Sequence, residues 1–326
     1  MVVPSRAMDI SVVAAAREDE SPPLEAAAIA AVADRLGYGE VWVGEGPTWD
    51  AFALAAAVGV QSRRVALTVG PIPVHVRDPF TIARGASCIA ALVGRPVGVA
   101  LGTSSTRVVE GVHGRARSHP VCALAASAAE VGDLMGPRTG SVDLPAHGFS
   151  WRLPPGGGPV TVAAFGERAV GVAVEHADRM LLDLVSPAQV RMLRARRDAA
   201  AERAGRPAPP LAAWIPAAVD PTPRDYDQVM RSIVGYLTVR GYSDMFVDAG
   251  FGHAVQLART GASTEQLLSR LPRAAAAEVG LVGDVDTVRA RLDAYAAAGL
   301  DEIAVYPTTA GDPGGERTLT ALSTLR

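Results

Sequence analysis

Lysine and asparagine are absent from this chain of 326 residues, so all 31 of its basic side chains are arginine. Without lysine the chain has no side-chain amine for a Schiff base and no lysine for a phosphate-binding P-loop. No Gly-x-Gly-x-x-Gly run follows a strand-like segment either. These absences exclude kinase, P-loop nucleotidase and lysine-dependent aldolase chemistry.

Cysteine is scarce, and the two that occur, Cys88 and Cys122, lie far apart in the chain. They form no C-x-x-C spacing or other recognised metal-ligand pattern, and each lies in an apolar, helix-like context. We therefore expect two small buried thiols, with no disulfide and no metal site.

The chain also has no excess of basic residues, few aromatic residues and no long apolar run. The formal net charge is -3 and aromatic residues make up 5% of the chain, which argues against a nucleic-acid groove. No apolar segment approaches the roughly 20 residues of a membrane span, and the first ten residues lack the apolar centre of a signal peptide. We expect a cytoplasmic protein that binds a small molecule, with no nucleic-acid or membrane partner.

Strand-like and helix-like apolar patterns alternate along the chain. Almost continuous apolar runs predict strands at 10–14, 40–43, 65–69, 97–101, 160–164, 179–182, 211–219 and 302–306. Segments of helical periodicity lie at 24–36, 49–60, 79–92, 121–134, 167–175, 187–204 and 318–325. A long, mostly helical region separates the last two strands.

This alternation predicts an α/β fold, a single (β/α)8 TIM barrel over residues 1–326, because continuous apolar strands are typical of a parallel sheet covered by helices. An open doubly wound sheet is the alternative, since strand order cannot be read from a sequence. Asp78-Pro79 and Ser186-Pro187 each place a capping side chain before a proline and so predict helix starts. Two segments, about 136–159 and 223–277, are too long for ordinary connections. We interpret them as insertions after strands four and seven that shape the mouth of a pocket.

Several motifs agree in order and spacing with one family. They are VWVGEGPTWD, TVGPIPVHVRDPFTIARGASCIAAL, GVALGTSS, GVHGRARSHPVCALAASAAEVGDLMGP, VTVAAFGERAVGVAVEHADRMLLDLVSPAQV and GLDEIAVYP. From about Ile10 to Pro307 the chain resembles the bacterial luciferase-like monooxygenase superfamily and, more narrowly, its F420-dependent oxidoreductases. The resemblance implies a TIM barrel that holds the deazaflavin F420, or alternatively FMN, across its C-terminal mouth. It also implies hydride transfer between reduced F420 and a small electrophile such as an enone or imine, and a homodimer.

The first group of implied cofactor residues follows the third and fourth strands. The family carries a cis peptide bond in a bulge that backs the cofactor ring, and here the matching bond is Gly70-Pro71, next to Ile72. A cis bond before proline costs only about 0.5–1 kcal/mol relative to the trans bond. The alternative is an ordinary turn in which the Gly70-Pro71 bond is trans. After the fourth strand, hydroxyl and amide groups of Gly102, Thr103 and Ser104 could bind the cofactor, although such clusters also form solvated turns.

The second group lies farther along the chain. Phe165, Gly166, Glu167 and Arg168 follow the fifth strand and begin a helix, and a helix N-terminus beside an arginine suits a phosphate. Without the resemblance to the family, Arg168 is interpreted as a surface residue that forms an ion pair. His119 stands before a proline where the family repeats the GRARSHP pattern. It either contacts the cofactor tail or shapes the helix entry.

The implied catalytic groups are Glu45 and His75. Many F420-dependent members have Asp-His after the second strand, and here the pair is Glu45 and Gly46. The carboxylate is retained and could move a proton, but the imidazole is missing. His75, in the loop after the third strand, could replace it, although a loop histidine is more often solvated. The missing histidine and missing lysine argue against a sugar-phosphate dehydrogenase.

Four further residues lie where strands end and are expected to line the substrate pocket: Trp49, Asp183, Trp214 and Tyr306. Polar groups at the C-terminal ends of barrel strands are typical of functional residues in this fold. The alternative is that any one of them is a rim residue with its hydrogen bonds satisfied, and that Trp49 is a core residue. Two alternatives to the F420 reaction stay open. One is a monooxygenase that uses reduced FMN, and the other is a barrel that binds a flavin or ligand without turnover.

Overall fold

Eight parallel strands close into a ring in the computed structural model, which describes residues 8–18, 21–22, 24–136, 142–143, 150–152, 154–239 and 241–326. The ring contains β1 (Asp9–Ala14), β2 (Glu40–Val43), β3 (Ala66–Pro73), β4 (Val97–Gly102), β7 (Gly157–Ala163), β8 (Arg179–Asp183), β9 (Leu211–Val219) and β11 (Glu302–Pro307). Each strand pairs in parallel with the next, β8 pairs with β9, and β11 pairs with both β9 and β1. The predicted (β/α)8 barrel is confirmed, and the open doubly wound sheet is excluded.

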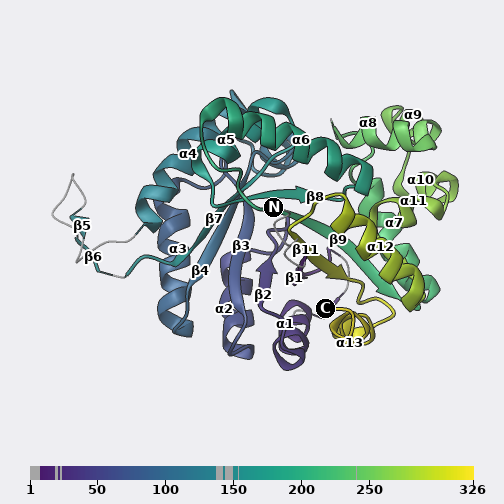
Figure 1. Ribbon diagram of the computed structural model, residues 1–326, viewed down its shortest axis with the longest axis horizontal. Helices are drawn as coiled ribbons and strands as arrows, with labels where there is room; N and C mark the ends of the chain where they lie inside the picture. Colours follow the sequence, from purple (N-terminus) through teal and green to yellow (C-terminus); the bar gives the residue numbers. More distant parts are fainter. Residues whose placement is uncertain are drawn as a thin grey trace, which may run out of the picture.

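Helices surround the ring on its outer side (Figure 1). They are α1 (Glu25–Leu36), α2 (Ala51–Gln61), α3 (Pro79–Val93), α4 (Pro120–Met135), α5 (Glu167–His176), α6 (Pro187–Ala204), α12 (Val285–Ala297) and α13 (Glu316–Ser323). Both predicted caps are present: Asp78 accepts a hydrogen bond from the Thr81 amide at 2.9 Å, and Ser186 accepts one from the Gln189 amide at 3.3 Å. The caps fix where the loops after β3 and β8 end, and therefore where the barrel mouth begins.

The N-terminal end of the barrel is closed by a buried ion network. The Arg179 guanidinium donates to Glu40 at 2.7 Å and to Glu302 at 2.6 Å, and it stacks 4.0 Å above the Trp42 ring. Ser11 donates to Glu302 at 2.5 Å. Burial raises the pKa of Glu302, and the nearby Glu40 carboxylate raises it further, whereas Arg179 lowers it. A barrel sealed in this way is open to ligands at its other end, the C-terminal mouth.

The region 223–277 forms a separate group of short helices beside the mouth, shown at the side of the barrel in Figure 1. They are α7 (Pro223–Val234), α8 (Tyr242–Phe246), α9 (Gly252–Arg259), α10 (Thr264–Arg270) and α11 (Ala274–Val279), with a π-helical turn at Val247–Phe251. Their apolar faces pack into a core of their own, in which Ile233, Phe246 and Val255 are fully buried. The short strand β10 (Leu281–Gly283) then pairs with β9 outside the ring.

The other predicted insertion begins after α4, where β5 (Val142–Asp143) and β6 (Ser150–Trp151) form a small antiparallel pair. Trp151 packs edge-on against Phe80 at the start of α3, with ring centroids 5.4 Å apart. Much of 136–159 lies outside the described residues. Between β4 and α4 the chain also forms a π-helical turn at Arg107–Val112, and η3 (Pro313–Gly315) precedes α13.

The prediction of two buried thiols is wrong for Cys122, which is exposed on α4, whereas Cys88 is half-buried. The apolar run around Cys122 misled the prediction because α4 turns its apolar stripe through Leu124, Ala128 and Val131 instead. In the part of the chain that the structure describes, no helix is both long and apolar enough to cross a bilayer.

Candidate active site at the barrel mouth

A cavity of about 230 Å³ lies at the C-terminal ends of the strands. It is lined by Ala15, Ala16, Glu18, Gly44, Glu45, Gly46, Pro47, Trp49, Asp183, Leu184, Trp214, Pro216, Ser232, Tyr236 and Tyr306. The loops after β1 and β2, the ends of β8, β9 and β11, and the α7 region all contribute. The structure thus brings together all four residues predicted for the substrate pocket, and Glu45 with them.

Asp183, the last residue of β8, is one of three carboxyls that line this cavity. Burial raises its pKa to about 6, although hydrogen bonds from the Tyr236 and Tyr242 hydroxyls lower it. Asp183 is half-buried, and among the described residues it has no arginine partner. Asp183 can therefore gain or lose a proton near neutral pH.

The two tyrosines come from the insertion after β9 and were not predicted as site residues. Tyr236 follows α7, Tyr242 begins α8, and their rings lie 4.6 Å apart. The Asp183 charge raises the pKa of Tyr236, and burial raises that of Tyr242, so both hydroxyls stay protonated as donors. A signal existed in the sequence, because Tyr236 continues the apolar face of α7 formed by Val229 and Ile233.

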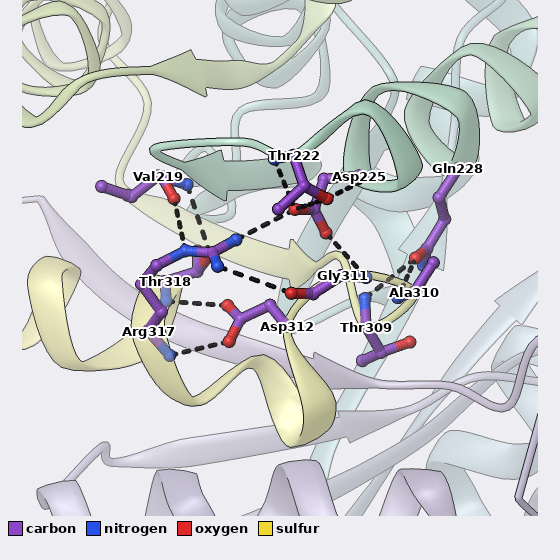
Figure 2. A network of polar contacts seen from close by, with 10 residues as sticks. All are labelled: Val219, Thr222, Asp225, Gln228, Thr309, Ala310, Gly311, Asp312, Arg317 and Thr318. Carbon is purple, nitrogen blue, oxygen red and sulfur yellow. Dashed lines mark hydrogen bonds and ion pairs between the residues drawn. The ribbon is translucent and has the colours of Figure 1, made fainter.

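A polar network fixes α7 over the mouth (Figure 2). Asp225, fully buried in the first turn of α7, accepts hydrogen bonds from the Gly311 amide at 3.1 Å and from Arg317 at 2.9 Å. Gln228, one turn later, accepts from the Thr309 and Ala310 amides, both at 2.9 Å. Helix α7, which Tyr236 follows, is thus tied to the loop after β11.

Glu45 faces the cavity, but both of its oxygens have partners. Arg77 donates to Oε1 at 2.9 Å, and the Ala51 amide at the start of α2 donates to Oε2 at 2.7 Å. Arg77 also contacts Asp50 at 2.6 Å. In this arrangement Glu45 ties the loops after β2 and β3 together, and it would have to leave Arg77 to carry a proton.

Gly46 stands where many members of the resembling family have histidine. A side-chain carbon built at this position would collide with the Glu18 carboxylate. Glu18 also accepts a hydrogen bond from the Thr48 amide at 3.3 Å. Sequence reasoning missed Glu18, although it follows the first strand as other site residues follow theirs.

His75 and His119 lie away from the cavity lining. His75 Nε2 lies 2.9 Å from the Ser118 carbonyl oxygen, and its Nδ1 is buried without a partner among the described residues. His119 is exposed and precedes α4 in a left-handed backbone conformation, with φ of 46°. Both histidines therefore border the segment between β4 and α4.

The implied ring-backing residues Gly70, Pro71 and Ile72 lie outside the cavity lining, at the end of β3. The Gly70–Pro71 bond is cis, and Gly70 has a φ of 120°, a conformation that favours glycine. A side-chain carbon at Gly102 would lie 3.4 Å from Pro71 and 3.7 Å from Ala163, so β3, β4 and β7 end side by side. Ile72 is fully buried in the main hydrophobic core, so it presents no exposed surface at the mouth.

Arg117 holds the loop that follows β4. Its guanidinium donates to the Ser104 carbonyl at 3.0 Å and to the Thr103 hydroxyl at 3.1 Å. Ser104 has a φ of 51°, which is uncommon for a residue other than glycine. The predicted cofactor loop is therefore held in one defined conformation.

The segment after β7 contacts the insertion that carries Tyr242. The ring of Phe165 lies 4.6 Å from that of Tyr242, the partner of Asp183. Gly166 then begins α5 without a side-chain cap, so the first amides of this helix are open to an anion. Glu167 pairs with Arg203 at 3.7 Å, and the exposed Arg168 guanidinium lies 3.9 Å from the Cys122 sulfur.

Four of the residues that line the cavity are aromatic: Trp49, Trp214, Tyr236 and Tyr306. Trp214 meets Trp42 edge to face with centroids 6.0 Å apart, and its indole nitrogen is buried without a partner among the described residues. Trp49, in the loop after β2, and Tyr306, on β11, also belong to the lining. Aromatic side chains and small residues thus share the lining with the carboxyls of Asp183, Glu18 and Glu45.

Solved structures share this architecture at low sequence identity. An F420-dependent secondary alcohol dehydrogenase in complex with an F420-acetone adduct is 15% identical, with a TM-score of 0.75 over 98% of this chain and 100% of that one. The coenzyme F420-dependent tetrahydromethanopterin reductase from Methanopyrus kandleri is 14% identical, with a TM-score of 0.78 over 97% of both chains. The FMN-bound oxygenating constituent of 3,6-diketocamphane monooxygenase from Pseudomonas putida is 14% identical, with a TM-score of 0.65 over 97% of both chains.

A search of curated protein sequences found no match. The sequence profile of a family described as luciferase-like monooxygenase, in contrast, matches residues 8–302, which is most of the chain. The F420-dependent and FMN-dependent structures above share the fold that this profile implies. The chain belongs to the luciferase-like monooxygenase family.

Proposed function

We propose that this chain is an F420-dependent oxidoreductase that transfers a hydride between reduced F420 and a small organic electrophile, such as an enone or imine. The observation that carries the proposal is Asp183, a carboxyl with a pKa of about 6 inside a small cavity at the barrel mouth. Reduction by hydride requires a proton as well, and a group that titrates near neutral pH can supply it.

The residues at the mouth fit a deazaflavin. The cis Gly70–Pro71 bond and Gly102 form a side-chain-poor platform, where a flat ring could lie against backbone. The uncapped amides at the start of α5 and the exposed Arg168 suit a phosphate-bearing tail. When bound, F420 supplies the hydride, and the protein supplies orientation, water exclusion and the proton.

The volume of the cavity limits the size of the substrate. About 230 Å³ is smaller than the pockets of roughly 300–1,000 Å³ that hold drug-sized ligands. We assign the cavity to the substrate and the platform to the cofactor. Among these residues Asp183 holds the proton, Tyr236 and Tyr242 orient its carboxyl, and Trp49 and Trp214 provide apolar walls.

A monooxygenase that uses reduced FMN is the second candidate, because the family description and the camphane monooxygenase favour it. The two F420-dependent structures support the first candidate with higher TM-scores, 0.75 and 0.78 against 0.65. The homodimer implied by the resemblance stays a prediction, which light scattering would test.

Fluorescence titration of the purified chain with F420 and with FMN decides between the candidates. We expect F420 to bind and, when reduced, to be oxidised by cyclohex-2-enone or 2-methyl-1-pyrroline. Binding of FMN without binding of F420 would favour the monooxygenase. Binding of F420 without turnover of any enone or imine would instead favour a barrel that only binds the cofactor.

A further inference from the structure

The Asp183 carboxylate accepts hydrogen bonds from the Tyr236 and Tyr242 hydroxyls and from the Leu184 backbone amide, and among the described residues no cation contacts it. The groups that face it from the surrounding elements are Tyr236, Tyr242, Tyr306, Glu18 and Glu45. Glu45 is neutralised by Arg77, whereas Glu18 lies exposed at the rim. Among the described residues that line the cavity there is no basic side chain. The cavity therefore has an electrostatic preference for positive charge.

The walls of the cavity have the same preference. Trp49, Trp214, Tyr236 and Tyr306 surround it, and the faces of aromatic rings carry negative charge density that attracts cations. An anionic substrate, such as a carboxylate or phosphate ester, would be repelled by the Asp183, Glu18 and Glu45 carboxylates of the lining. A buried carboxylate without a counterion is costly unless a ligand completes the pair.

Building on the proposed function, we infer that the substrate is a small imine, held in its protonated, cationic form by the Asp183 carboxylate and the aromatic walls. A neutral imine that meets protonated Asp183 takes the proton at nitrogen, and a protonated imine that meets the carboxylate pairs with it directly. Both routes give the same bound ion pair.

The reaction balances from this pair. The imine carbon gains a C–H bond from the hydride of reduced F420, which is oxidised, while the C=N π electrons become the lone pair of the product amine. Asp183 keeps its negative charge during the transfer, and Tyr236 and Tyr242 continue to donate to it. The product amine takes a proton from solvent and leaves as the ammonium ion, and where the substrate arrived as the neutral imine, Asp183 also regains its proton from solvent.

Binding of unreactive probes to the cofactor-free protein tests this inference. Pyrrolidine is cationic near neutral pH, and cyclopentanone is a neutral ring of the same size. We expect calorimetry to show tighter binding of pyrrolidine, with an affinity that rises about tenfold from pH 5 to pH 7 as Asp183 ionises. Cyclopentanone should bind without this pH dependence.

Three variants locate the effect. Asp183→Asn should weaken pyrrolidine binding at least tenfold at pH 7 and abolish its pH dependence, with cyclopentanone changed less than threefold. Tyr236→Phe removes a donor that lowers the Asp183 pKa, so the midpoint of pyrrolidine binding should move to higher pH. Asp286→Asn, a control at the exposed start of α12 and outside the cavity lining, should change affinity less than threefold.

Two results would overturn the inference: cyclopentanone binding as tightly as pyrrolidine, or pyrrolidine binding unchanged in Asp183→Asn. An infrared measurement of the Asp183 carboxyl is independent of any ligand. A carboxyl that is already ionised below pH 4 would show that the chain supplies its own cation, and would also overturn the inference.

The outcome is separable from that of the proposed function, because no probe experiment involves F420. Loss of the pyrrolidine preference with normal F420 binding and normal enone reduction removes the imine assignment alone. Failure of F420 to bind, with the pyrrolidine preference intact, removes the proposed reaction and leaves the cation site.

Discussion

The Asp183 carboxylate lies at the end of β8 and accepts hydrogen bonds from two tyrosine hydroxyl groups, with no arginine beside it among the described residues. Its position at the end of β8 could be predicted, because strand ends of a parallel barrel converge at the mouth. Its environment could not be predicted, because Tyr236 and Tyr242 lie more than 50 residues further along the chain. The same limit applies to Glu45, whose partner Arg77 follows a different strand.

Asp183→Asn should make the protein more stable above pH 6. The pKa of Asp183 rises from 3.8 to about 6 on folding, so between these values the native state holds a proton that the unfolded chain has released. Native stability therefore falls as the pH rises through this window. The two-unit shift corresponds to roughly 2–3 kcal/mol, part of which is offset by weaker hydrogen bonds in the variant.

Urea unfolding at pH 4 and pH 8 measures this effect. We expect the variant to gain about 1–2 kcal/mol over the wild type at pH 8 and nothing at pH 4. Asp286→Asn, on the exposed start of α12, is the control and should show no such difference. Parallel stability profiles of Asp183→Asn and the wild type would contradict the prediction.

At the scale of the elements, the predicted bounds are correct for strands whose own sequence determines where they begin and end. The strands at 40–43 and 211–219 have the predicted bounds, because each is a continuous apolar run between polar turns. The three residues of β10 were missed, since such a short strand exists only by pairing with β9. The fixed position of α7 was also missed, because it depends on contacts from Asp225 to the loop after β11.

Asp225→Asn should loosen this attachment. Although burial favours the neutral acid, donors from Thr222 and the Arg317 guanidinium hold the pKa of Asp225 below its usual value, so the carboxylate stabilises the fold at neutral pH. An amide replaces one accepting oxygen with a donor and leaves Arg317 without its charge partner. We expect a loss of about 2–3 kcal/mol.

Hydrogen exchange and urea unfolding measure this change. The amides of Thr309, Ala310 and Gly311 should exchange faster in the variant, because they donate to α7. Asp227→Asn is the matched control on the same helix, where an exposed ion pair with Arg231 at 2.8 Å contributes under about 1 kcal/mol. Equal effects of the two substitutions would show that the Asp225 network does not hold the helix.

At the scale of the whole molecule, the two ends of the barrel have different tasks. The N-terminal end is closed by Arg179, Glu40 and Glu302, which fill the space between strands with paired charge. The C-terminal end keeps an open cavity, the Asp183 carboxyl with its tyrosine partners, and an uncapped helix start. A ligand that binds the open end should therefore stabilise the entire fold, because the strands that end there form one closed sheet.

Bound F420 should raise the melting temperature as a single cooperative shift. At a concentration about 100 times its dissociation constant, a ligand that binds only the native state contributes about 2.7 kcal/mol. With roughly 2.1 cal/mol/K of unfolding entropy per residue, a chain of 326 residues should melt about 4 °C higher. Scanning calorimetry measures the shift, with FMN at the same concentration as the control. A shift of under about 1 °C for FMN is expected if the barrel selects the deazaflavin, and a larger shift with FMN than with F420 would reverse the cofactor assignment, because stabilisation follows relative affinity.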